Sequence, residues 1–181
     1  EVDATGFDDQ AGNSYAGIAD STTWNFITED ITPPTVVAYS PADDSDRVPI
    51  DANLVMTFSE PVNPIFGDIR IRRSSDGSLF EAIPVGGVGG SGTSVITIDP
   101  VGTLTGETGY YIEVDATCFM DFAGNSYAGI ADSTTWNFIS ADVTAPVVSG
   151  LVPADDSVGV GVNAVLVMTF SEVVNAGAGD I

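Results

Sequence analysis

Residues 52–59, ANLVMTFS, alternate the large apolar side chains of Leu54, Met56 and Phe58 with smaller or polar ones. A period of two places successive side chains on opposite faces of a β-strand. The stretch therefore predicts a strand with one face in a core. Similar period-two runs recur along the chain, and helix-period patterns are weak.

The strand also belongs to an internal repeat. Residues 1–69 align with 113–181 without a gap, and 47 of these 69 positions are identical. The offset of 112 residues is the size of one small domain. We expect 1–33 to be the end of one unit plus a linker, 34–145 a complete unit plus its linker, and 146–181 the start of a third. Neither partial unit can bury its apolar face alone, so we expect each to be covered by another chain or to continue in a longer array.

Seven strands are predicted in the complete unit, at 35–40, 52–59, 68–73, 79–84, 94–99, 109–115 and 134–139. Seven short strands in about 110 residues are typical of an immunoglobulin-like sandwich. The predicted fold is all-β: a seven-stranded immunoglobulin-like β-sandwich in tandem, one complete unit flanked by two partial ones. Asp76-Gly77 predicts a two-residue hairpin turn. Leu104 and Tyr110 resemble a tyrosine corner, and Trp24 and Trp136 are expected in the core.

Composition excludes several functions. The 181 residues include 26 acidic residues, four arginines, no lysine and no histidine, and the net charge is −22. A nucleic-acid or anionic membrane surface needs clustered positive charge, and a Ser-His-Asp or Cys-His centre needs histidine. No apolar run is long enough for a membrane helix. The single Cys118 cannot form an intrachain disulfide, and Gly6 at its repeat position argues against a catalytic thiol.

The acidic residues gather where two units are expected to meet. Strands of a sandwich alternate in direction, so loops sort to two poles. The incoming linker and the 59–67 and 116–133 loops are expected at one pole, and the 41–51 loop, the Asp76 turn, the 100–108 loop and the outgoing linker at the other. The linkers at 29–34 and 141–146 join the poles of neighbouring units, which predicts that Asp30, Glu60 and Asp121 meet at the first joint. At the second joint the expected group is Asp43, Asp44, Asp46, Asp142 and Glu172. Oxygen ligands at flexible spacing favour Ca²⁺, which takes six to eight of them. We therefore expect Ca²⁺ at the joints, bound by a set drawn from Asp30, Asp43, Asp44, Asp46, Glu60, Asp121, Asn125, Asp132, Asp142, Asp155, Asp156 and Glu172.

The same residues are also compatible with a chain that binds no ion. The acidity can serve a solvated, halophile-like surface. Residues 121–125, DFAGN, can form an Asx turn with glycine in a left-handed conformation, with or without a ligand. The segment PADDS at 41–45 can be an ordinary polar loop.

Three segments carry a family resemblance: PPTVVAYSPADDSDRVPIDANLVMTFSEPV at 33–62, GETGYYIEVDA at 106–116 and DFAGNSYAGIADSTTWNF at 121–138. Together they resemble the bacterial immunoglobulin-like repeats of very large surface adhesins, and more narrowly the extender modules of repeats-in-toxin (RTX) adhesins. The resemblance implies secretion to a bacterial cell surface, a stalk that serves cell adhesion and biofilm formation, and stiffening of the stalk by Ca²⁺. Similar modules occur in S-layer proteins and as spacers in secreted glycosidases.

The function expected from these observations is a structural extender with calcium-stiffened joints, located outside the cell. Its partners are neighbouring repeats of the same chain. Nucleic acid, membrane insertion and a small-molecule substrate are not expected. The alternative is a module that binds a carbohydrate or a surface, although no exposed aromatic platform or flat threonine-rich face is evident. Enzymatic activity, such as glycoside hydrolysis by paired carboxylates, is not expected.

Overall fold

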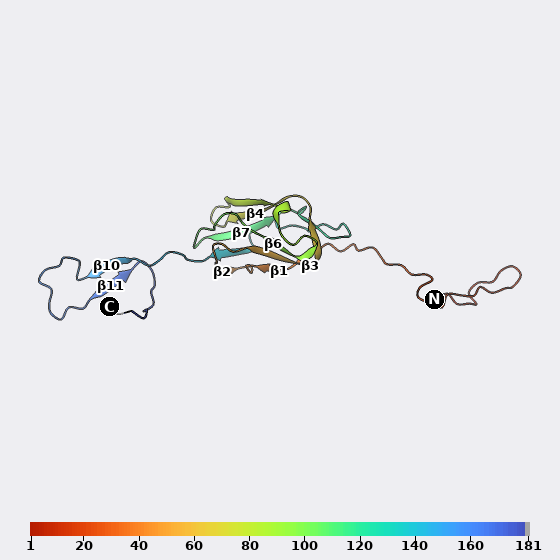
Figure 1. Cartoon of the computed structure of the whole chain (residues 1–181), viewed down its shortest axis with the longest axis horizontal. Coiled ribbons are helices and arrows are strands. Elements are labelled where there is room, and N and C mark those ends of the chain that lie inside the picture. Colours follow the sequence, from red (N-terminus) through yellow and green to blue (C-terminus); the bar gives the residue numbers. More distant parts are fainter. Residues whose placement is uncertain (180–181) are drawn as a thin grey trace.

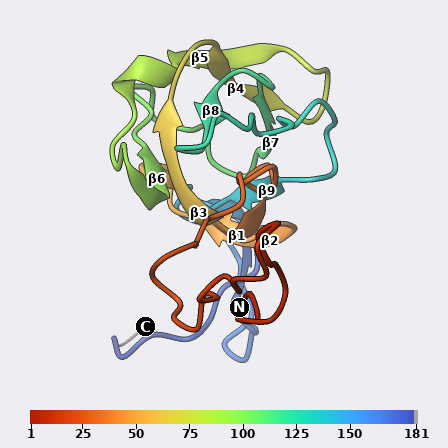
Figure 2. The same ribbon diagram turned by 90° about the vertical axis from the view of Figure 1, so that its right-hand side faces the viewer.

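Apolar residues at alternate positions of the strands form the facing layers of a two-sheet sandwich (Figures 1 and 2). This computed structural model describes residues 1–179, so positions 180–181 of the expected third unit lie outside the described residues. The fold class expected from the sequence, an all-β immunoglobulin-like sandwich, is confirmed. None of the helices within residues 1–179 has the length and apolar character needed to span a membrane.

One sheet is built around a long strand, β3, whose neighbours are β1, β6 and, at its far end, β8. The second sheet has the order β2-β9-β7-β4-β5. The bounds of the first sheet are β1 (Val36–Ser40), β3 (Leu54–Pro64), β6 (Thr93–Ile98) and β8 (Phe119–Met120). Those of the second are β2 (Ser45–Val48), β4 (Asp68–Arg73), β5 (Leu79–Pro84), β7 (Gly109–Val114) and β9 (Asn137–Ser140), with a short 3₁₀ helix, η1 (Val85–Gly87), after β5.

Each of the seven expected ranges overlaps a strand, and β2 and β8 are additional. The expected 59–67 loop is wrong for its first part, because β3 continues to Pro64, where it pairs with β8. β2 lies inside the expected 41–51 loop and pairs in parallel with β9. The expected two-residue hairpin is wrong: Arg73 and Ser78 close the β4–β5 connection, which leaves four residues, 74–77, between them. Gly77 there has a φ of 68°, a conformation that glycine adopts without strain.

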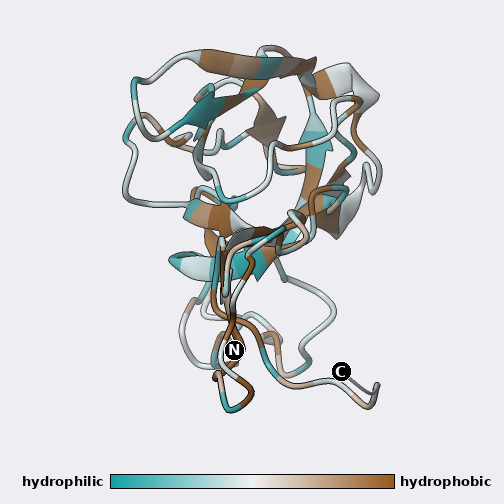
Figure 3. Cartoon of the chain, turned by 90° about the vertical axis from the view of Figure 1, so that its left-hand side faces the viewer, coloured by the Kyte–Doolittle hydropathy of each residue, from teal (hydrophilic) through white to brown (hydrophobic). Residues whose placement is uncertain are grey.

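The core lies between the two sheets of the complete unit. Trp136 and Tyr110 are fully buried, and the Trp136 ring stacks on Tyr39 with ring centroids 4.6 Å apart. Thr105 N–H donates to the Tyr110 hydroxyl oxygen at 2.9 Å, which closes the expected tyrosine corner. Along the strands, brown apolar and teal polar segments alternate in Figure 3, as a half-buried strand requires.

The flanking segments project from opposite ends of the sandwich (Figure 1). The C-terminal segment contains a two-stranded sheet of β10 (Val148–Val152) and β11 (Val167–Phe170). The N-terminal segment has isolated bridges, such as Val2 with Ile18, and no longer strand among its described residues. Trp24 was expected in a core but is 71% exposed, because residues 1–33 lack the sheets that cover its counterpart Trp136.

Candidate functional site: an acidic cluster at the entering linker

Three carboxylates from separate parts of the chain converge where the N-terminal linker reaches the sandwich. Asp30 lies in the linker, Glu60 lies in β3 and Asp121 directly follows β8. One oxygen of each carboxylate lies within 4.8 Å of an oxygen of the other two. Two oxygens that are each about 2.4 Å from one Ca²⁺ can be at most about 4.8 Å apart. The spacing therefore fits a single coordination sphere. The sorting of loops to poles predicted that these three residues would lie close together.

The local sequence shapes the Asp121 loop. The Asp121 carboxylate accepts hydrogen bonds from the N–H groups of Ala123 (2.9 Å) and Asn125 (2.8 Å) and from Asn125 Nδ2 (2.8 Å). Gly124, with a φ of 97°, makes the turn that brings these donors together. The Asx turn proposed from the sequence is thus present, and it holds Asp121 at 5% exposure.

The same loop forms a second time around Asp9, outside the cluster of Asp30, Glu60 and Asp121. Asp9, 112 positions before Asp121, accepts the same hydrogen bonds from Ala11 and Asn13. Both copies therefore obtain the turn from their own five residues. In the complete unit, Asn125 Nδ2 also donates to the Asp30 backbone oxygen at 3.2 Å, which connects the loop to the linker.

Charge repulsion is concentrated at this cluster. Partial burial, together with the negative charges of Asp30 and Asp121, raises the pKa of Glu60. Burial also acts to raise the pKa of Asp121, but the hydrogen bonds from its own loop outweigh it and the pKa is lowered. Like charges at this spacing repel. The donor set therefore suits a cation that accepts only oxygen ligands.

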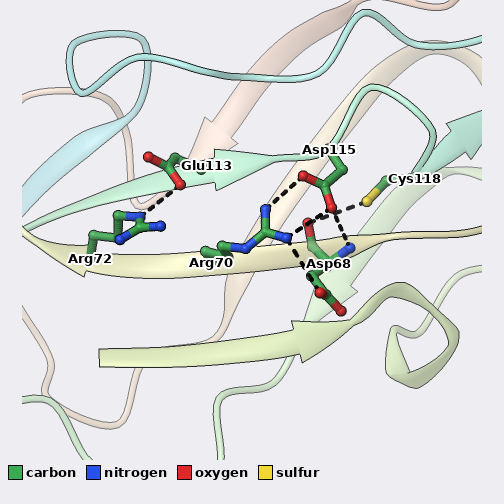
Figure 4. Close-up of polar contacts among 6 residues, drawn as sticks. All are labelled: Asp68, Arg70, Arg72, Glu113, Asp115 and Cys118. Atoms are coloured by element: carbon green, nitrogen blue, oxygen red, sulfur yellow. Dashed lines mark hydrogen bonds and ion pairs between the residues drawn. The ribbon is translucent and has the colours of Figure 1, made fainter. Parts of the chain in front are cut away.

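The ion pairs of the described residues lie elsewhere, on β4. Arg70 pairs with Asp115 at 2.6 Å and with Asp68 at 3.4 Å, and Arg72 pairs with Glu113 at 2.7 Å (Figure 4). These arginines offset acids on the outer face of the second sheet. The described ion pairs leave the Asp30, Glu60 and Asp121 carboxylates without a cationic partner.

Part of the same arrangement recurs at the outgoing linker. Asp142 and Glu172 are the counterparts of Asp30 and Glu60, and burial together with Asp142 and Glu107 raises the pKa of Glu172. Thr144 N–H donates to Asp142 at 2.8 Å, as Thr32 N–H donates to Asp30 at 2.9 Å. Glu107, in the loop before β7, was not among the expected ligands. Glu107 lies in the 100–108 loop, which was expected at this pole, and this placement could have identified it as a candidate ligand.

Asp43 and Asp44 lie beside the start of β9 and do not join Asp142 and Glu172 in the described part of the chain. Asn137 donates its N–H to Asp43 (2.9 Å) and its Nδ2 to both carboxylates (3.0 and 3.1 Å). Asn137 is five residues before Asp142, about 16 Å along an extended strand. The expected grouping is wrong because the chain crosses to the second sheet here and forms β2, which the sequence did not indicate.

The remaining expected ligands occupy three other positions. Asp46 is exposed on β2, and Asp155 and Asp156 are exposed in the loop after β10. Asp132 accepts the N–H and hydroxyl groups of Thr134 and Thr135, at 2.8 Å each. These bonds, that from the Thr134 N–H foremost, lower its pKa to about 2. Asp132 is thus accounted for by the turn that precedes β9.

Comparisons with known proteins place the fold in a family. The family model described as a bacterial Ig-like domain matches residues 30–140. A search of curated proteins gives no match. Among solved structures, the crystal structure of CopC from Methylosinus trichosporium OB3b is similar at a TM-score of 0.44, with 16% identity over 62% of this chain and 97% of that chain. That likeness is too distant to bear on function. Because the family model covers more than half of its residues, the chain belongs to the bacterial Ig-like domain family.

Proposed function

We propose that the chain is a structural extender of a bacterial surface protein, and that Ca²⁺ fixes the angle between each linker and the sandwich that follows it. The observation that supports this most directly is the meeting of linker Asp30 with Glu60 and Asp121 of the sandwich. An ion held by all three would join two parts of the chain that are otherwise connected by a short linker.

The fit of Ca²⁺ rests on the donor set. Three carboxylates supply up to six oxygens, and Ca²⁺ takes six to eight at 2.3–2.6 Å, with water completing the shell. Zinc prefers nitrogen and sulfur ligands, and within residues 1–179 the single cysteine, Cys118, is buried. Burial and, after it, repulsion from Asp30 and Asp121 raise the pKa of Glu60, and the cation would remove the repulsion. Each of these points favours a hard divalent cation.

The tandem repeat supports the extender role. The linker acid Asp30 and the β3 glutamate Glu60 recur 112 residues later as Asp142 and Glu172. A site that recurs at each linker would stiffen an array along its whole length. The proposed location is the bacterial cell surface, in an adhesin of the RTX type, and a spacer role in an S-layer protein or a secreted glycosidase would use the same joint. Neighbouring repeats are the proposed partners, and no catalytic activity is proposed.

Calcium titration of the full chain tests the proposal. Extracellular modules bind Ca²⁺ with a Kd of about 10⁻⁴ to 10⁻³ M. At about 10 mM Ca²⁺, binding to the folded state alone should add about 1.4–2.7 kcal/mol to the free energy of unfolding. Binding heat measured by calorimetry and a higher melting temperature are the expected results.

Asp121→Asn should remove both effects. Asp9→Asn is the matched control, because Asp9 makes the same loop contacts but lies outside the acidic cluster. No heat and no change in melting temperature up to about 10 mM Ca²⁺ would refute the proposal. An equal loss in both variants would assign the effect to the Asx loop rather than to the joint, and would refute it too.

A further inference from the structure

The outer face of the first sheet, which lies wholly within the described residues, carries no charged side chain. Along β3 the buried core residues alternate with Val55, Thr57 and Ser59, which therefore lie on the opposite face. The strand register places Ala38 of β1 and Val95 of β6 on either side of Thr57. We call the outward residues of these three strands the neutral face: Val37, Ala38, Ser40, Val55, Thr57, Ser59, Thr93, Val95 and Thr97.

The absence of charge distinguishes this face from the rest of the complete unit. Residues 34–145 contain 15 acidic residues and four arginines. On the outer face of the second sheet, arginines of β4 form ion pairs with acidic residues of β4 and β7 or directly after β7. The sequence segments that build the first sheet contain none of these charged residues: 36–42, 52–59 and 82–98. The neutral face is therefore a local feature of an otherwise strongly acidic surface.

The neutral face belongs to the complete unit and lies away from both joints. The flanking segments project from the two ends of the sandwich (Figure 1), whereas this face lies along its side. Val37 and Val95 are 63% and 44% exposed there. The next repeat has different residues at three of the six positions that it shares with this face, and all six are again uncharged: Ser149, Gly150, Val152, Val167, Thr169 and Ser171.

We propose that the neutral faces of two copies of this chain pack against each other, so that the copies lie side by side. Two chains of net charge −22 repel wherever their carboxylates approach, and the neutral face lets them meet without bringing carboxylates together. Exposed valine and threonine side chains suit the packing of one sheet on another, at about 10 Å. Because both copies use the same face, the contact is two-fold and closes on itself.

The size of the neutral face limits the strength of a single contact. Three strands of about five residues, with a rise of about 3.3 Å per residue and a spacing of about 4.8 Å, present roughly 240 Å². A stable interface buries about 800 Å² on each partner, so one pair of units associates only transiently. In a tandem array the first contact raises the effective concentration for the next, which strengthens the association of two stalks. This extension to stalks rests on the proposed extender function, whereas the pairing of two faces does not.

Amide chemical shifts of the full chain, measured by NMR in a calcium chelator, test the pairing separately from the calcium site. Between about 0.1 mM and 2 mM protein the amides of β1, β3 and β6 should shift progressively, because an interface of millimolar affinity fills over this range. Sodium chloride at about 0.5 M should enlarge the shifts, since it screens the repulsion between the copies. Val95→Asp and Ala38→Asp should each abolish them, because each places carboxylates in the contact. Both side chains are exposed, so the variants should keep the dispersed spectrum of the folded sandwich.

Ser75→Asp is the matched control, because it adds the same charge in the exposed turn between β4 and β5, on the second sheet. It should shift with concentration like the unaltered chain. Constant shifts in β1, β3 and β6, or changes confined to residues outside 34–140, would overturn the inference. An equal loss in Ser75→Asp would assign the effect to net charge and would overturn it too. Shifts of the neutral face that dextran causes and protein concentration does not would assign the face to a carbohydrate, which is a third contrary result.

Discussion

Replacing Tyr110 by Phe isolates one hydrogen bond of the tyrosine corner. The Tyr110 ring is fully buried, and its hydroxyl accepts the Thr105 N–H at 2.9 Å. The substitution keeps the ring and removes the acceptor. A buried donor left without a partner costs about 1–3 kcal/mol. For a domain near this size each kcal/mol lowers the melting temperature by about 4–8 °C.

The corner also connects β9, the last strand of the sandwich, to the loop before β7. Ser140 Oγ donates to the Thr105 backbone oxygen at 2.6 Å, and Thr108 N–H donates to Ser140 Oγ at 3.0 Å. Loss of the Tyr110 acceptor therefore loosens the end of β9, where the outgoing linker begins.

Urea unfolding followed by tryptophan fluorescence measures the effect, because Trp136 is buried and reports on the core. Tyr111→Phe is the matched control, since the neighbouring Tyr111 lies on the half-exposed face of β7. Removal of the Tyr111 hydroxyl should change the free energy of unfolding by no more than about 0.5 kcal/mol. Equal stabilities of the two variants would refute the role assigned to the corner.

Trp136→Ala should cost about 3–5 kcal/mol of stability while Trp24→Ala leaves it unchanged, and comparable losses in urea unfolding would contradict the difference in burial. Burial raises the pKa of Cys118 to about 11, so its thiol should stay unreactive to alkylating reagents at pH 8 until the protein unfolds; prompt labelling of the native chain would argue against this packing. The pKa of Glu60 is higher in the folded state than its usual value of 4.5, so in chelator protonation should add stability as pH falls from 7 towards 4.5. Glu60→Gln should abolish that gain, and an unchanged dependence of the urea midpoint on pH would count against the cluster.

The sequence predicts the fold where side chains alternate over several residues. β3 and β7 each bury every second residue for most of their length, which gives a clear period-two pattern. β2 and β8 were missed because they have four and two residues and are held by pairing with β9 and β3 rather than by a pattern of their own. Their positions depend on tertiary contacts that a local pattern cannot report.

The acidic residues show the same division. Asp30, Glu60 and Asp121 meet because the linker, the later part of β3 and the loop after β8 lie at one pole, as the alternation of strand direction predicts. Asp43 and Asp44 were assigned to the opposite pole because 41–51 was expected to be a single loop. The chain instead crosses to the second sheet there, and Asn137 holds both carboxylates at the edge of β9. Assigning them correctly required knowledge of β2.

The distance between the N-terminal segment and the sandwich tests the central claim most directly. Spin labels at the exposed positions Ser21 and Ser75 report this distance, and the buried Cys118 takes no label. If Ca²⁺ joins Asp30 to Glu60 and Asp121, the distance distribution should be narrow with calcium and broad in chelator, and Asp121→Asn should keep it broad in both. A distribution of the same width with and without calcium would contradict the account.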